Sequence, residues 1–170
     1  MKGTVILSHG LESGPSATKV SALAVVADAL GWANVRPDYR DLDARRDPAT
    51  VEARIARAVG HAPERGRVVF AGSSMGAFTS GFASIRRACA GLFLLSLPTA
   101  IPGYPHAFVA ADVRTVLVHG WNDELCPVDA AIDFARARGA NVHLVRDDHR
   151  LGAHVAYCAD AFRRFLADLD

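Results

Sequence analysis

Short apolar runs rich in β-forming residues alternate with helical patterns along the chain, and this alternation constrains the fold more than any other feature. A continuous apolar run is typical of a strand covered on both faces. Strands that alternate with helices predict a parallel sheet with helices on both sides. We therefore expect a three-layer, doubly wound α/β fold with about six parallel strands. The predicted strands span residues 4–7, 34–36, 67–71, 92–97, 115–119 and 142–145.

Five segments between or after these runs have apolar residues at helical spacing. Gly31 and Gly139 stand where a glycine commonly ends a helix, and Asp47-Pro48 is typical of a helix start. The predicted helices span residues 16–30, 47–59, 75–87, 127–138 and 153–169.

Length and charge bound the class of protein. The 170 residues suit a single domain over 1–170. Nineteen Lys+Arg against eighteen Asp+Glu excludes a strongly basic nucleic-acid binder. No apolar run reaches the roughly 18 residues of a membrane span, and the apolar start of the chain is too short for a signal peptide. We expect no nucleic-acid or membrane partner.

The three cysteines, Cys89, Cys126 and Cys158, are widely spaced and form neither a disulfide framework nor a metal motif. A reducing, cytoplasmic compartment is the natural expectation. We expect no metal site.

Ligand sites of open parallel sheets lie beyond the carboxyl ends of the strands. Directly after the predicted strand 67–71 comes Gly72-Ser73-Ser74-Met75-Gly76, which fits G-x-S-x-G and precedes a predicted helix. This context indicates a nucleophile elbow, a tight turn that lifts the Ser74 hydroxyl clear of the sheet. The backbone N–H of Met75, at a helix N-terminus, would stabilise developing negative charge. The alternative is a small-residue turn without a catalytic role.

A serine nucleophile needs a base, and the base needs an orienting acid. Asp123 follows the predicted strand 115–119, and His149 follows the strand 142–145. The three residues come from different parallel strands, as a shared site at the carboxyl edge requires. We therefore predict the triad Ser74, Asp123 and His149.

Other residues near these two could take the same roles. Asp123 could be only a turn residue. Glu124 and Asp148 are the substitute acids, and His154 is the main competitor of His149.

The segment His9-Gly10-Leu11 follows the first predicted strand. A glycine there allows the backbone to approach a ligand closely. The N–H of Leu11 would then be a second oxyanion donor, with His9 and Gly10 beside the substrate. The alternative is a simple glycine turn.

These segments resemble the motifs of the α/β-hydrolase superfamily over nearly the whole chain. The order serine, aspartate, histidine is that of the superfamily. The segment from His119 to Pro127 is similar to the H-G-x-x-D-x-x-V-P segment of small esterases and dienelactone-hydrolase-like enzymes. Cys126 stands where valine is usual, which indicates a packing role.

The chain looks like the short bacterial members that have no lid. Compared with many relatives, we expect the usual first two antiparallel strands to be absent and no cap domain to follow the predicted strand 92–97. The resemblance implies a minimal α/β-hydrolase fold. In the connection that replaces the cap, Tyr104, His106 and Phe108 could line a substrate pocket, or the loop could only cover the sheet's end.

We predict a serine hydrolase that cleaves a small carboxylic ester or thioester through an acyl-enzyme, with no cofactor. An amidase or peptidase that uses the same triad, and a non-catalytic binding protein of this fold, are the alternatives. The partner would be a small molecule. The sequence does not fix the oligomeric state. Trp32 and the loop around Ile101 could form surface patches, so a homo-oligomer is an alternative to a monomer.

Overall fold

The computed structural model describes residues 2–169, so the end residues 1 and 170 of the predicted domain lie outside the described part. Its centre is a six-stranded sheet in the order β2-β1-β3-β4-β5-β6. Every neighbouring pair of strands is parallel, as predicted. The strands are β1 (Thr4–Ser8), β2 (Ala33–Val35), β3 (Val68–Ser73), β4 (Gly91–Leu95), β5 (Arg114–Gly120) and β6 (Asn141–Val145).

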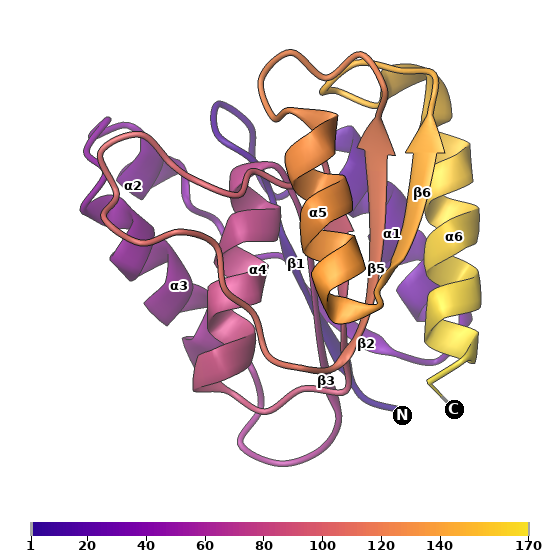
Figure 1. Ribbon diagram of the computed structural model, residues 1–170. Coiled ribbons are helices and arrows are strands. Elements are labelled where there is room, and N and C mark those ends of the chain that lie inside the picture. Colours follow the sequence, from indigo (N-terminus) through magenta and orange to yellow (C-terminus); the bar gives the residue numbers. More distant parts are fainter. Residues whose placement is uncertain (1, 170) are drawn as a thin grey trace.

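Helices cover both faces of the sheet (Figure 1). Helices α1 and α6 pack against each other on one face, and α3, α4 and α5 cover the other. The predicted three-layer α/β fold is confirmed. The helices are α1 (Thr18–Ala29), α2 (Arg40–Asp43), α3 (Thr50–Gly60), α4 (Met75–Arg86), α5 (Val128–Arg138) and α6 (Val155–Ala167), with a short 3₁₀ turn at Gly152–His154.

Two apolar layers hold the sheet between its helices. On the α1–α6 side, Phe93 of β4 packs on Phe162 and Phe165 of α6, with ring centroids 4.9 and 5.6 Å apart. Trp32 lies in the same layer and is only 2% exposed. It therefore cannot form the surface patch considered from the sequence. The continuous apolar pattern of the strands follows from this burial on both faces.

The connection from β4 to β5 covers a helix and does not form a cap. Among the described residues it contains no helix or strand, and Figure 1 shows it crossing in front of α4. Its Phe108 and Tyr104 rings each lie 5.7 Å from the ring of Phe78 in α4. The Phe108 ring occupies the space where a Cβ on Gly81 would stand, at 2.1 Å.

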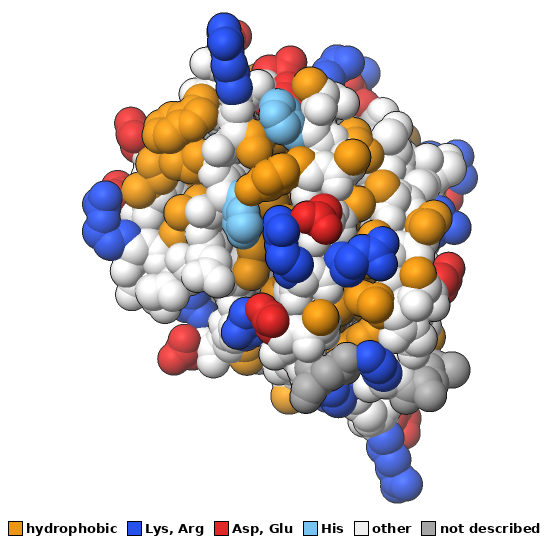
Figure 2. Space-filling view, turned by 90° about the vertical axis from the view of Figure 1, so that its right-hand side faces the viewer, with side chains coloured by type: hydrophobic (Ala, Val, Ile, Leu, Met, Phe, Trp, Pro, Cys, Tyr) orange, Lys and Arg blue, Asp and Glu red, His pale blue; other side chains and the backbone are white. Residues whose placement is uncertain are grey.

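The surface fits the near-neutral charge of the chain. On the face shown in Figure 2, acidic and basic side chains are mixed with hydrophobic ones. None of the helices within residues 2–169 has the length and apolar character that crossing a membrane requires.

Contacts too close for a side chain fix the junction between β3 and α4. A Cβ on Gly76 would stand 2.0 Å from the carbonyl oxygen of Ser8 in β1. A Cβ on Gly72 would stand 2.3 Å from the carbonyl oxygen of Gly76. The two glycines of the G-x-S-x-G segment therefore allow α4 to begin directly against the ends of β1 and β3.

We expect Gly76→Ala to lower the free energy of unfolding by about 3 kcal/mol or more, because the methyl group would overlap rigid backbone. Gly60→Ala is the matched control, since a Cβ there meets nothing within 4 Å and the change should stay within about 1 kcal/mol. Urea unfolding of both variants measures this. Equal stabilities of the two variants would contradict the packing described.

Candidate active site

The Ser74 side chain stands on a strained turn at the carboxyl end of β3. Its backbone has φ 55° and ψ −123°, a region that residues other than glycine rarely occupy. The turn is held because the Ser74 N–H donates to the Leu95 carbonyl at 2.9 Å and the Ser74 carbonyl accepts from the Ala77 N–H at 2.8 Å. Met75 is the first residue of α4, so its N–H has no acceptor inside the helix.

Three side chains from three strand ends form one hydrogen-bonded chain. His149 Nε2 lies 2.8 Å from Ser74 Oγ, and His149 Nδ1 lies 2.8 Å from Asp123 Oδ2. A carboxylate only accepts, so Nδ1 carries the proton and Nε2 is free to accept from the serine hydroxyl. The structure thus brings together the three residues that the sequence singled out.

The Asp123 carboxylate is fixed by donors on several sides. Its Oδ1 accepts from the N–H groups of Leu125 and Cys126 at 3.0 and 2.8 Å. Its Oδ2 also faces Nε2 of the buried His119 at 3.2 Å. The same His119 nitrogen lies 2.8 Å from the Cys126 carbonyl, so it carries a proton. These contacts hold the carboxylate in the orientation that meets His149.

Two side chains hold the loop that carries His149, and the sequence did not point to either. Ser96, at the end of β4, donates from Oγ to the His149 carbonyl at 2.8 Å. Lys19 of α1 donates from Nζ to the next carbonyl, Arg150, at 2.5 Å. Burial of its ammonium group lowers the pKa of Lys19. An isolated serine or lysine in the sequence gives no signal for such a contact.

The loop after β1 lies directly against the elbow. A Cβ on Gly10 would stand 3.3 Å from the Ser73 carbonyl oxygen and 3.4 Å from Cβ of Ser74, so a side chain there would press against the elbow backbone. The ring of His9 is fully buried and holds this loop from below. Its Nδ1 donates to the Gly10 carbonyl at 2.8 Å, and its Nε2 accepts from the Tyr39 N–H at 3.0 Å.

This arrangement orients the peptide between Gly10 and Leu11. The Gly10 carbonyl accepts from His9 Nδ1 and also from Ser13 Oγ at 2.9 Å. In a trans peptide the N–H points away from the carbonyl. The Leu11 N–H therefore points to the side opposite these two donors, and none of the hydrogen bonds found among the described residues uses it or the Met75 N–H.

The other sequence candidates lie apart from this chain of contacts. His154 pairs with Asp147, with Nδ1 2.9 Å from Oδ2. Asp148 accepts from the Arg150 N–H, and Glu124 is exposed. Tyr104 is not among the residues of the cleft that contains Ser74, and its hydroxyl bonds to Glu52 instead. Tyr104 thus packs on α4, while Ile101 and Pro102, earlier in the same connection, line the cleft.

The cleft above Ser74 has a volume of about 1470 Å³. Its apolar lining residues include Ile101, Pro102 and Leu125. Leu125 is 75% exposed there. The rest of the lining includes charged side chains of both signs, among them Lys19, Arg40, Arg54, Arg150, Glu12, Asp43 and Asp47.

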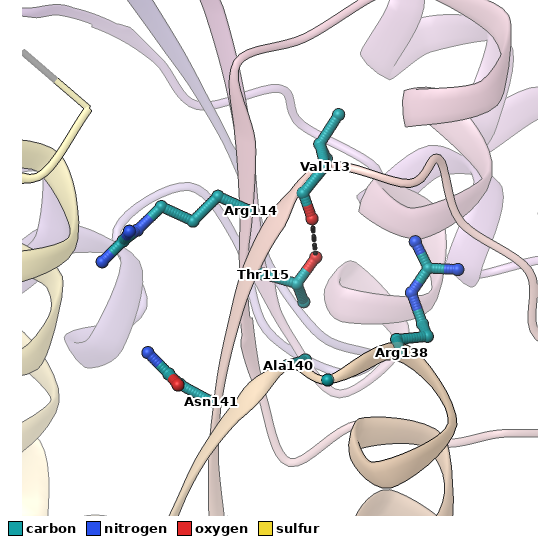
Figure 3. Close-up of a pocket in the computed structure, with 7 residues that line it drawn as sticks. Val113, Arg114, Thr115, Arg138, Ala140 and Asn141 are labelled. Atoms are coloured by element: carbon teal, nitrogen blue, oxygen red, sulfur yellow. Dashed lines mark hydrogen bonds between the residues drawn. The ribbon is translucent and has the colours of Figure 1, made fainter.

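A second, smaller pocket lies at the opposite end of the sheet (Figure 3). It has a volume of about 240 Å³ and is lined by the starts of β5 and β6. Thr115 Oγ1 donates to the Val113 carbonyl at its wall. This pocket contains none of the residues predicted for the site.

One group of side chains in the described part has the spacing of metal ligands. Single ligand atoms of Asp123, Cys126 and His149 lie within 4.8 Å of one another. The carboxylate and imidazole are already bonded to each other. Burial, and then the nearby Asp123 carboxylate, raise the pKa of Cys126 to about 12, so its thiol stays protonated. The arrangement suits proton transfer better than metal binding.

Comparison with solved structures identifies the family of this chain. A protein from Xanthomonas campestris pv. campestris, named as a candidate hydrolase of the α/β superfamily, is 46% identical to this chain, with a TM-score of 0.93. The match covers 98% of this chain and 99% of the other. The chain belongs to the α/β-hydrolase superfamily. It is a small member without a lid, as the resemblance of its motifs implied.

More distant members share the fold alone. Est1E from Butyrivibrio proteoclasticus, also solved with ferulic acid bound, is 17% identical with a TM-score of 0.70, over 98% of this chain and 88% of that one. A thioesterase domain from the curacin biosynthetic pathway is 15% identical with a TM-score of 0.71, over 97% and 91%. No family model and no curated protein matches the chain.

The buried His9 leads us to predict how the stability of the protein depends on pH. Burial lowers its pKa from the ordinary 6.5, so in acid the unfolded chain takes up a proton that the folded chain does not. The contribution of the neutral His9 ring to the free energy of unfolding is complete above about pH 6.5. It is lost as the pH falls, and the free energy of unfolding then decreases by at most about 1.36 kcal/mol per pH unit. Urea unfolding at pH 7.5 and 5.5 should therefore show a smaller loss of stability in acid for His9→Asn than for the wild type.

His61→Asn is the control for this measurement, because His61 is exposed. It should keep the pH dependence of the wild type. An unchanged pH dependence in His9→Asn would contradict the buried, neutral state of His9.

Proposed function

We propose that this protein is a serine hydrolase that cleaves a carboxylic ester or thioester through an acyl-enzyme. The observation that supports this most strongly is the continuous hydrogen-bonded chain from Ser74 Oγ through His149 to Asp123, with a distance of 2.8 Å at each step. Nucleophile, base and orienting acid within hydrogen-bond reach are what nucleophilic catalysis needs.

Acylation begins when Ser74 Oγ attacks the carbonyl carbon of the substrate and its proton passes to His149 Nε2. The carbonyl oxygen becomes an oxyanion, which the N–H groups of Leu11 and Met75 stabilise. When the tetrahedral intermediate collapses, the bond to the leaving group breaks and His149 gives its proton to that group. Water then attacks the acyl-enzyme by the same steps and releases the acid.

Asp123 works through His149. Its bond to Nδ1 keeps the tautomer in which Nε2 accepts, and its negative charge stabilises the imidazolium formed during each step. His119 and the N–H groups of the 123–126 turn keep the carboxylate in place. Both roles depend on a carboxylate that cannot rotate.

The cleft favours an acyl or alcohol group with an apolar part. Ile101, Pro102 and Leu125 line it, and the Leu11 side chain, 52% exposed, stands at its edge. Ferulic acid bound to Est1E and the thioesterase domain of similar fold are consistent with ester or thioester substrates. Since the segment from β4 to β5 packs on α4, no cap closes over the substrate.

A fluorophosphonate probe should label the wild-type protein covalently at Ser74, because the probe needs an activated serine. Intact-mass spectrometry and peptide mapping measure this. Ser74→Ala should not be labelled. Absence of labelling in a folded wild type, or equal labelling of both proteins, would overturn the proposal in favour of a binding protein of this fold.

Hydrolysis of p-nitrophenyl esters should fall about 10⁴-fold in kcat in Asp123→Asn, because the amide would favour the wrong tautomer of His149. Asp133→Asn is the matched control, since Asp133 lies on the exposed side of α5 and should keep wild-type turnover.

Parallel assays with acyl thioesters and matching p-nitroanilides separate the ester and thioester activity from an amidase. A wild type that is faster on the anilides would contradict the substrate class.

A further inference from the structure

One guanidinium group is buried beneath the loop after β1. Arg54 of α3 is 1% exposed, and its Nη2 donates to the His9 carbonyl at 2.5 Å. Nη1 forms an ion pair with Asp43, and the group lies over the Tyr39 ring, 4.1 Å from its centroid. Nε lies 3.4 Å from Thr79 Oγ1. The guanidinium is thus enclosed by groups from the β1 loop, α2 and α4.

Stability alone does not account for this arrangement. The cost of removing two charges from water often equals or exceeds their attraction, so a buried ion pair contributes little net stability compared with apolar residues of the same volume. Burial also raises the pKa of Tyr39 to about 12, which keeps its ring a neutral phenol. Arg54 and Asp43 form the most deeply buried ion pair at this place, with side chains 1% and 10% exposed. A role in addition to stability would explain why the pair is buried there.

The contact made by Nη2 indicates that role. The His9 carbonyl accepts from Arg54, and the next carbonyl, that of Gly10, accepts from the His9 ring and from Ser13. Two successive carbonyls of the loop are therefore held by side-chain donors. The peptide that presents the Leu11 N–H cannot turn over without breaking the two bonds to the Gly10 carbonyl. Arg54 holds the peptide directly before it, between His9 and Gly10, and so fixes the backbone from which the Leu11 N–H is presented.

We propose that Arg54 is a positioning residue for the oxyanion site: its buried guanidinium holds the His9 carbonyl and so keeps the Leu11 N–H directed at the reacting oxygen. This inference rests on the proposed function. Although Arg54 is among the residues that line the cleft, it is only 1% exposed. It therefore acts through the backbone of the loop and not by contact with the substrate carbonyl. Its effect belongs to the transition state, where the oxyanion exists, and not to the binding of the uncharged ester.

The test compares Arg54→Lys and Arg54→Met with Arg86→Met. Arg86 forms a partly exposed ion pair with Glu52 on the neighbouring helix and serves as the matched control. Loss of one oxyanion donor lowers kcat about 10²- to 10³-fold in known enzymes. We expect a loss of this size in kcat for Arg54→Met with KM within about twofold, a smaller loss for Arg54→Lys, and wild-type values for Arg86→Met.

Two further readouts separate positioning from a general structural role. An alkyl boronic acid that adds to Ser74 places an anionic oxygen in the oxyanion site, so its Ki should rise with the loss in kcat. Amide hydrogen exchange in residues 9–13 should become faster in both Arg54 variants. This second measurement needs no activity. It also applies to Arg54→Lys if Arg54→Met fails to fold.

A folded Arg54 variant with wild-type kcat, boronate affinity and exchange would overturn the inference and leave the proposed function standing. A parallel rise in KM and fall in kcat, with unchanged boronate affinity, would also overturn it. A wild type that neither turns over esters nor reacts with fluorophosphonate would overturn the proposed function, and the inference with it. The two failures are thus distinguished by whether the wild type is active.

Discussion

The contact between the start of α4 and the end of β1 decides where the serine stands. Gly76 lies so close to the Ser8 carbonyl that no side chain fits between them. Because β1 also continues into the loop of Gly10, the same contact sets the distance from Ser74 to the backbone opposite it. The proposed nucleophile and the proposed oxyanion donors are therefore positioned together by backbone packing, before any catalytic side chain is considered.

The parallel sheet then brings the remaining groups to one edge. In the register of the sheet, Ser73 lies beside Leu95 and Gly120 beside Val145, so β3, β4, β5 and β6 end at neighbouring points. Strand β4 supplies none of the three residues of the proposed triad. The end of β4 nevertheless holds Ser74 and His149 in place, because the Leu95 carbonyl accepts from the Ser74 N–H and Ser96 Oγ donates to the His149 carbonyl.

The sequence predicted the sheet, the five longer helices and the three side chains that meet at the site. It did so because strand burial and the G-x-S-x-G turn leave local patterns. It did not predict α2 or the support given by Arg54 and Ser96. Arg54 contacts His9, which is 45 positions away in the sequence, and Ser96 contacts His149, which is 53 positions away. A single arginine or serine gives no sequence pattern from which such a distant partner could be predicted. The sequence also left Trp32 open as a surface residue, because large aromatic residues are common both in cores and at interfaces.

The positive φ of Ser74 has a consequence for the evolution of the chain. A glycine would adopt this conformation with less strain, by roughly 1 kcal/mol. Selection for stability alone would therefore favour replacing the residue on which the proposed chemistry depends. Under the proposed function, the serine at the elbow is a compromise in which the native state is less stable than its backbone permits, and a protein of this fold without that reaction would have no need of it.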